Sequence, residues 1–142
     1  MIEGAIVQTI LADSAISNQI GKYGTGRAVF SRDVLPKDCV YPAILVAPVT
    51  GRDFGVRDQK GGESFYDVSI YFDRSRQTED AERTLTRALW KFLNRVELIG
   101  LDEIEMEDCG VWADPPIKHS DDEKFPGYTI RVRALVLDTS DE

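Results

Sequence analysis

The chain has 142 residues and a mass of 15.9 kDa, the size of one ordinary domain, so separate cofactor and substrate domains are not expected. With 42% hydrophobic and 30% charged residues, it is expected to fold around a core and to be soluble. Its 17 Lys and Arg against 25 Asp and Glu give a net charge of -8. Tight binding to nucleic acid is not expected, because phosphate contacts depend on clustered cations, although an acidic surface suits DNA that passes without sticking.

Targeting signals are not apparent in the sequence. No stretch approaches the roughly 20 apolar residues of a membrane helix. The first residues lack the positive region of a secretory signal, and Glu3 and Asp13 interrupt the apolar stretch. A cytoplasmic product with no membrane partner is therefore expected. Cys39 and Cys109 lie far apart without CxxC spacing, which indicates ordinary reduced thiols in that compartment.

The N-terminal part predicts helical segments followed by strands. Ile2, Ile6 and Ile10 recur at helical spacing and indicate an amphipathic helix that pauses at Asp13. A short helical turn follows, and Gly21 suits its C-terminal end. The expected elements are a helix over residues 2–12, a turn ending at Gly21, a loop over 21–26, a strand over 27–31 and a stronger strand over 43–47.

The middle of the chain changes from an irregular to an alternating pattern. Residues 50–64 hold four glycines and six charged residues without helical or strand periodicity, which predicts a long mobile loop. From Tyr66 to Asp73 apolar and more polar residues alternate, with Tyr66 and Val68 on one face and Asp67 on the other. This period of two predicts a half-buried strand.

Residues 78–96 carry the clearest helical signal. Thr78 is expected to cap the helix, because the acidic residues that follow it suit the positive end of the helix dipole. An apolar stripe then runs to Val96, and Gly100 lies just beyond the helix. The stripe consists of Ala81, Leu85, Ala88, Leu89, Phe92, Leu93 and Val96.

The C-terminal part predicts a weak strand around Ile104 and Met106, a proline-rich loop and a last strand over residues 128–137. This order of elements, without alternating βα units, indicates an α+β fold: an antiparallel sheet of four to five strands with two helices packed on one face. The chain is expected to form a single α+β domain over residues 1–137, followed by an acidic C-terminal tail over 138–142.

Signals of catalysis are weak. His119 is the only histidine, and the acids at 121–123 match neither zinc nor EF-hand spacing, so a solvated loop is expected there. No serine lies in a GxSxG turn, and the glycine-rich stretches fit neither the dinucleotide fingerprint nor the P-loop. No catalytic, cofactor-binding or metal-binding residue is assigned, and no cofactor is expected. A small hydrolase or metal-dependent enzyme built around His119 is kept as an alternative of a different functional class.

Two surfaces are candidates for contacts between subunits. Trp90 lies on the polar side of its helix, because nine steps of about 100° from Ala81 place it nearly opposite the stripe. Either the N-terminal helix covers it or it contacts another subunit, since tryptophan beside arginine is typical of interface hot spots. The outer sheet face, with Tyr71, is either a second contact surface or a solvated face with Asp67 paired to Arg131. The candidate interface residues are Arg83, Arg87, Trp90, Asn94, Tyr71, Arg131 and Arg133.

Several segments together resemble a known family. They are IVQTILADSAISNQIG near the start, VYPAILVAPVTG before the glycine-rich stretch, FYDVSIYFDRSRQTEDAERTLTRALWKFLNRV, and FPGYTIRVRALV near the end. In this order they are similar to the tail terminator, or tail completion, proteins of long-tailed bacteriophages, a family that includes minor tail protein U. The resemblance covers nearly the whole chain, and its motifs are moderately specific.

The resemblance implies a non-enzymatic α+β subunit of a homohexameric ring at the head-proximal end of the tail tube. Such a ring stops tube polymerisation and offers the surface that joins the head. The implied partners are further copies of the chain, the tail tube protein and a head-closure or connector protein, with DNA passing through the channel without specific binding. The implied location is the neck of the virion, and the host cytoplasm during assembly. Another neck component, such as a head-closure or adaptor protein, is the alternative.

The glycine-rich segment over residues 51–63 is expected to dock onto the tail tube or a neighbouring subunit. Its glycines raise the entropic cost of ordering, whereas charges of both signs and two apolar residues can anchor it on a partner. A solvated connection without a partner is the alternative. The candidate docking residues are Arg52, Asp53, Phe54, Val56, Arg57, Asp58 and Lys60.

Overall fold

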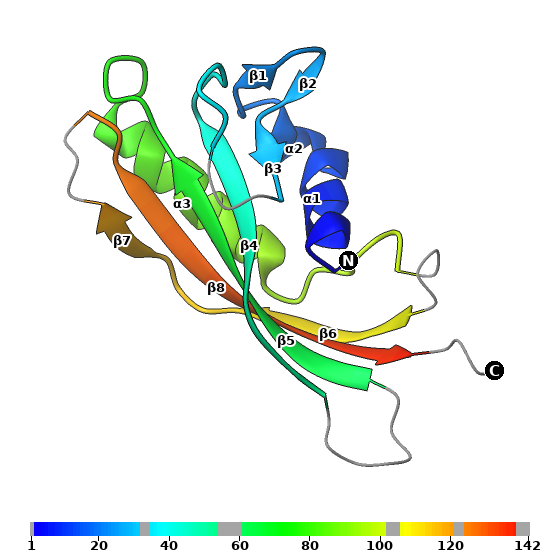
Figure 1. Ribbon diagram of the computed structural model, residues 1–142. Helices are drawn as coiled ribbons and strands as arrows, with labels where there is room; N and C mark the ends of the chain where they lie inside the picture. The colour runs from blue at the N-terminus through cyan, green and yellow to red at the C-terminus, as the bar shows by residue number, and fades with distance from the viewer. Residues whose placement is uncertain (1, 32–34, 54–60, 102–105, 121–123, 139–142) are drawn as a thin grey trace.

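The computed structural model describes residues 2–31, 35–53, 61–101, 106–120 and 124–138 (Figure 1). Short N-terminal elements precede two long strands, a long helix and three further strands. The elements are α1 (Ile2–Ala12), α2 (Ser14–Ser17), β1 (Lys22–Tyr23), β2 (Gly26–Arg27), β3 (Val29–Phe30), β4 (Ala43–Asp53), β5 (Gly61–Tyr71), α3 (Glu79–Leu93), β6 (Met106–Ala113), β7 (Ile117–Ser120) and β8 (Gly127–Asp138).

The main sheet is mixed and mostly antiparallel. Its strands follow the order β3-β4-β5-β8-β6, and β7 pairs with β8 beside β6. Only the short β3 is parallel to its neighbour, β4. The three helices pack against this sheet (Figure 1). The expected α+β class is confirmed, although the sheet has six strands rather than four or five and α2 adds a third helix of one turn.

The core lies between the helices and one face of the sheet. Alternate residues of β5 and β8, such as Val68 and Ile130, are fully buried, as the period of two predicts. Their partners from the helices include Ile6 and Ile10 of α1 and Leu89 of α3. The opposite face of β5 and β8 remains partly exposed. One face of the sheet is therefore left for other contacts.

The N-terminal helices form as the sequence predicts. The Asp13 carboxylate accepts a hydrogen bond from the Ala15 backbone N–H at 3.0 Å, which caps α2. Gly21 then meets the chain that enters β4: its N–H donates to the carbonyl of Pro42 at 2.8 Å. A Cβ atom on Gly21 would lie 1.7 Å from the Val40 carbonyl oxygen, so only glycine fits. The expected loop over 21–26 contains the hairpin of β1 and β2.

The predicted loop over residues 50–64 is largely sheet. β4 continues to Asp53 and β5 begins at Gly61, with Arg52 opposite Glu63 in the antiparallel register. A register shift between Pro48 and Thr50 allows the strand to pass the proline, which cannot donate a ladder hydrogen bond. Pairing between long strands therefore overrides the weak strand propensity of the glycines. Only residues 54–60 of the expected loop lie outside the described chain.

The weak strand expected around Met106 continues as β6 through Ala113, and β7 follows it, where a loop was expected. Both pair with β8, whose 12 residues provide an edge long enough for two successive strands. Gly110 interrupts the alternation of β6 at a register shift, with a positive φ of 146° and the ring of Trp112 against its Cα. This bulge hides the strand pattern in the sequence.

The long helix begins and ends near the predicted residues, but its buried face is rotated. Thr78 caps it by accepting a hydrogen bond from the Ala81 N–H at 3.1 Å. Ala81 is exposed, whereas Glu82 and Thr86 are buried alongside Leu89. The burial of Glu82 requires partners from elsewhere in the fold, and the periodicity of one helix does not reveal them.

Candidate interface surfaces

A groove lies on the surface between α3 and β7 and has a volume of about 500 Å³. The helix supplies one wall, and the segment from the end of β6 into β7, together with the start of β8, supplies the other. We call it the α3/β7 groove. Its lining residues are Arg83, Thr86, Arg87, Trp90, Pro116, Lys118 and Tyr128.

Trp90 forms the part of this groove nearest to β6. Its indole Nε1–H donates a hydrogen bond to the Ala113 carbonyl oxygen at 3.0 Å, and the side chain is partly buried. One helical turn later, the Asn94 Oδ1 atom accepts a hydrogen bond from the Ala113 N–H at 3.1 Å. α3 therefore binds both backbone groups of Ala113. The hydrogen-bond partner of the indole lies in β6 and not in the N-terminal helix. The ring also lines an open groove.

Tyr128, which lines the groove, contacts a buried ion pair. Glu82 of α3 is fully buried, and its two carboxylate oxygens accept hydrogen bonds from Arg74 at 2.6 and 3.0 Å. The Tyr128 hydroxyl donates to the same carboxylate at 3.4 Å. Burial and the adjacent Glu82 carboxylate raise the pKa of Tyr128 above its ordinary value. These contacts hold Tyr128 in place as a wall of the groove.

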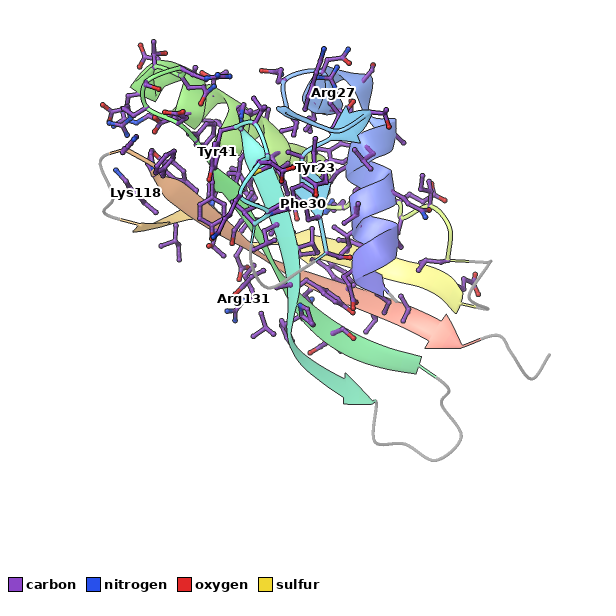
Figure 2. All side chains as sticks on the ribbon, turned by 45° about the horizontal axis from the view of Figure 1, so that its top comes forward. Tyr23, Arg27, Phe30, Tyr41, Lys118 and Arg131 are labelled. Carbon is purple, nitrogen blue, oxygen red and sulfur yellow. The ribbon has the colours of Figure 1, made fainter. Side chains whose placement is uncertain are left out.

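The rim of the groove is cationic. Arg83 is paired with Glu79 at 2.7 Å in an exposed (i, i+4) contact. Arg87 and Lys118 are exposed, and neither forms an ion pair with another residue in the described part of the chain. Figure 2 shows Lys118 on the strand that lies below the helix. A chain with a net charge of -8 thus carries a locally positive groove.

The second surface is the outer face of the sheet, away from the helices. Arg131 pairs with Asp67 across β8 and β5, with its Nε atom 2.6 Å from a carboxylate oxygen. Arg133 lies with its guanidinium 4.5 Å from the centre of the Trp112 ring. Figure 2 shows Arg131 on this side of the sheet. The Asp67–Arg131 pair is the one expected for a solvated face.

A depression of about 640 Å³ crosses this outer face, beside a smaller one that reaches the end of α3. Ile117 on its border is 70% exposed, an unusual amount for an isoleucine in a strand. We call the two depressions the outer-face surface. Its lining residues are Phe65, Asp67, Ser69, Tyr71, Asn94, Trp112, Ala113, Asp114, Pro115, Ile117, Thr129, Arg131 and Arg133.

The seven candidate interface residues therefore separate into two groups. Arg83, Arg87 and Trp90 lie together in the α3/β7 groove, whereas Asn94 joins Tyr71, Arg131 and Arg133 on the outer-face surface. Trp112, Lys118 and Ile117 were not predicted as site residues, because all three were expected in a loop. The local signal of a strand there was the high β propensity of Val111 and Trp112.

Several residues that were predicted to have a functional role lie in parts of the chain where the structure does not describe their side chains. Arg52 and Asp53 fall in β4, but only their backbone is described, and Phe54, Val56, Arg57, Asp58 and Lys60 lie outside the described residues. The backbone of His119 belongs to β7 rather than to a loop, and its side chain is likewise outside the description. The docking role of the first set and a chemical role of His119 thus stay predictions.

The described residues offer little support for other kinds of site. Within the described residues, no three or more His, Cys, Asp and Glu side chains gather in a way that could hold a metal ion. None of the described helices has the length and apolar character needed to span a membrane. Cys39 is buried, and this burial raises the pKa of its thiol.

These features define a small α+β protein with an open sheet face and a cationic groove at its helical edge. The sequence matches no protein-family model, and a search of curated proteins gives no match. Among solved structures, a chain described as "Virion of native gene transfer agent (GTA) particle" has the same fold, with a TM-score of 0.73. The match has 15% sequence identity and covers 96% of this chain and 94% of that one. The two chains thus share a fold over nearly their whole length.

Proposed function

We propose that this protein is a structural component of a phage-like virion, and specifically a tail terminator. In this role, copies of the chain form a ring, most simply of six subunits, at the head-proximal end of the tail tube. The ring ends tube polymerisation and offers the surface to which the head is joined. Its partners are the tail tube protein and a head-closure or connector protein.

The observation that carries this proposal is the fold shared with a chain of a gene transfer agent virion over 96% of the present chain. A fold alone does not define a function. The sequence segments that resemble tail terminators add independent support, because they lie in the same order along the whole chain. The two lines of evidence agree on a particle component.

Both candidate surfaces serve this proposal as contacts between proteins. The α3/β7 groove contributes Arg83, Arg87 and Trp90, and the outer-face surface contributes Tyr71, Asn94, Arg131 and Arg133. β4 and β5 extend beyond the helices at the end where Asp53 and Gly61 lie (Figure 1), which suits docking onto the tube or a neighbouring subunit through residues 51–63. The net charge of -8 suits a channel through which DNA passes without specific binding.

The test is electron microscopy of particles made with and without a functional copy of the gene. If the protein is a tail terminator, particles made without it are expected to have overlong tubes that carry no heads. Tails of normal length that fail to join heads would instead assign the protein to head closure or to an adaptor. Normal, joined particles would contradict both roles.

The enzymatic alternative has its own control. His119→Ala is expected to leave tail length and head joining unchanged, because an assembly protein does not need the imidazole. A variant that assembles normally but leaves particles inactive would favour an enzyme built around His119.

A further inference from the structure

We propose that the α3/β7 groove binds a carboxylate-bearing segment of another protein chain. The inference rests on the proposed function for one point, namely that the occupant is a protein of the particle. It adds the chemistry of that occupant: acidic side chains that meet the cationic rim, around an apolar residue that lies against Trp90.

The first argument is charge. Arg87 and Lys118 stand on opposite walls of the groove, one on α3 and the other on β7, and neither is paired with another described residue. Two acids of α3 are engaged with other residues, because Glu79 pairs with Arg83 and the buried Glu82 pairs with Arg74. Two cations without partners on facing walls favour an anionic occupant.

The second argument is the shape and composition between the two walls. Trp90, Pro116 and Tyr128 provide apolar and aromatic surface between the cationic groups. Aromatic side chains flanked by arginine are enriched at the centres of protein interfaces. A groove of this kind fits an acidic segment that also carries an apolar side chain, and a simple anion would leave the aromatic surface uncovered.

The third argument is a buried polar group in the same wall. Thr86 is 3% exposed, lines the groove, and its Oγ1 atom has no hydrogen-bond partner among the described residues. Buried hydroxyls normally have partners, so this one calls for an explanation. The Oγ1 atom is closed off from solvent, so rotation about the Cα–Cβ bond is needed to turn the hydroxyl into the groove, where a carboxylate oxygen accepts its hydrogen bond.

The two walls of the groove are also held in place in the unbound protein. The hydrogen bond from Trp90 to Ala113 and the contact of Tyr128 with Glu82 hold both aromatic side chains. A preformed site loses less conformational entropy on binding than a flexible one does. The groove therefore has the rigidity expected of a docking site.

Nucleic acid fits the groove less well. The three cations of the rim are few for a duplex, whose tight binding involves about 6–10 phosphate contacts. The remainder of the chain is acidic and would repel a polyanion that extends beyond the groove. A short acidic protein segment avoids this repulsion.

The test is a titration of the full chain with the acetylated, amidated peptide Glu-Glu-Leu-Glu-Glu, followed by NMR. The indole N–H resonance of Trp90, assigned by its loss in Trp90→Phe, is expected to shift until saturation. Binding is expected to weaken as salt is raised, because the contacts are charged and near the surface. The peptide Lys-Lys-Leu-Lys-Lys is expected to leave the resonance unchanged.

Charge-reversed variants test the assignment to this groove. Lys118→Glu is expected to lower the affinity by about tenfold or more. Lys22→Glu is the matched control, because Lys22 is exposed in β1, far along the chain from the groove, and the charge change is the same. Equal affinity in the two variants, or no saturable shift, would overturn the inference.

Three further outcomes are informative, and the last two separate this inference from the proposed function. Tighter binding of a ten-nucleotide oligothymidine than of the acidic peptide would overturn the protein occupant in favour of a nucleic acid. If Lys118→Glu abolishes peptide binding while tails assemble normally, the groove is not an assembly contact and the role of the protein at the tube end still stands. If particles are normal without the protein, the proposed function fails whatever the peptide does.

Discussion

The guanidinium of Arg74 holds the fully buried carboxylate of Glu82 with two hydrogen bonds of 2.6 and 3.0 Å. Arg74 lies between β5 and α3, and its side chain is 34% exposed, whereas Glu82 has no access to water. The hydrogen bond to Glu82 raises the pKa of Arg74 above its ordinary value. The pair connects the first turns of the long helix to the segment that follows β5, and it contacts Tyr128 of the α3/β7 groove.

Replacing Arg74 with alanine should strongly destabilise the protein. Breaking a buried ion pair by removing one partner costs about 3–5 kcal/mol, because the remaining charge has no compensation. Urea unfolding of Arg74→Ala measures this loss. Arg76→Ala is the matched control, since Arg76 is exposed and has no ion pair among the described residues. Equal stability of the two variants would show that Glu82 does not need its partner.

Alanine substitutions at Trp90 and at its neighbour Leu89 should separate an effect on association from an effect on folding stability. Trp90→Ala should weaken association by about 2 kcal/mol or more, as expected for an interface tryptophan. Leu89 is fully buried, so Leu89→Ala should lower the free energy of unfolding by about 2–5 kcal/mol. Sedimentation and urea unfolding measure the two effects.

A third variant isolates the indole hydrogen bond. Trp90→Phe keeps an aromatic ring but removes the N–H that donates to Ala113, which should cost about 1 kcal/mol of stability. Association should be weakened less than in Trp90→Ala. If Trp90→Ala unfolds the protein as readily as Leu89→Ala does, Trp90 acts in the core and not at an interface.

Two glycines should respond in opposite ways to alanine. Gly21→Ala places a Cβ atom 1.7 Å from the Val40 carbonyl oxygen, and relief of this clash requires backbone movement. The expected loss is about 3 kcal/mol or more of stability. Gly4→Ala in α1 meets nothing within 4 Å and should stabilise the helix by about 0.5–1 kcal/mol. Thermal unfolding of both variants provides the measurement, and a stable Gly21→Ala protein would contradict the described approach of Gly21 to Val40.

Asp73 should titrate below its ordinary pKa of 3.8, because the hydroxyl and the backbone N–H of Ser75 donate to its carboxylate. A lowered pKa in the folded state means that the contribution to stability is present above 3.8 and is lost as the pH falls through the folded value. NMR titration of the carboxyl carbon measures the pKa. Ser75→Ala removes the larger cause and should raise the pKa toward 3.8, and an unchanged value would contradict this assignment.

Local patterns in the sequence determined the main elements and the fold class. The cap at Thr78 and the spacing of Leu85, Leu89 and Leu93 depend only on residues within a few positions, so α3 could be predicted. The alternation in β5 and β8 also predicted which face of the sheet is buried. The same alternation placed Tyr71 and Arg131 on the open face, where the structure has them.

Contacts between distant segments determined the features that local patterns did not predict. The acidic residues after Thr78 were expected to suit the helix dipole, but one of them, Glu82, is buried because Arg74 and Tyr128 reach it from other elements. The greater part of β6 and all of β7 were missed because β8, rather than local propensity, supplies their hydrogen bonds. The α3/β7 groove arises only when Lys118 is brought beside Trp90 across 28 positions of the chain, and helical or strand periodicity carries no information at that distance.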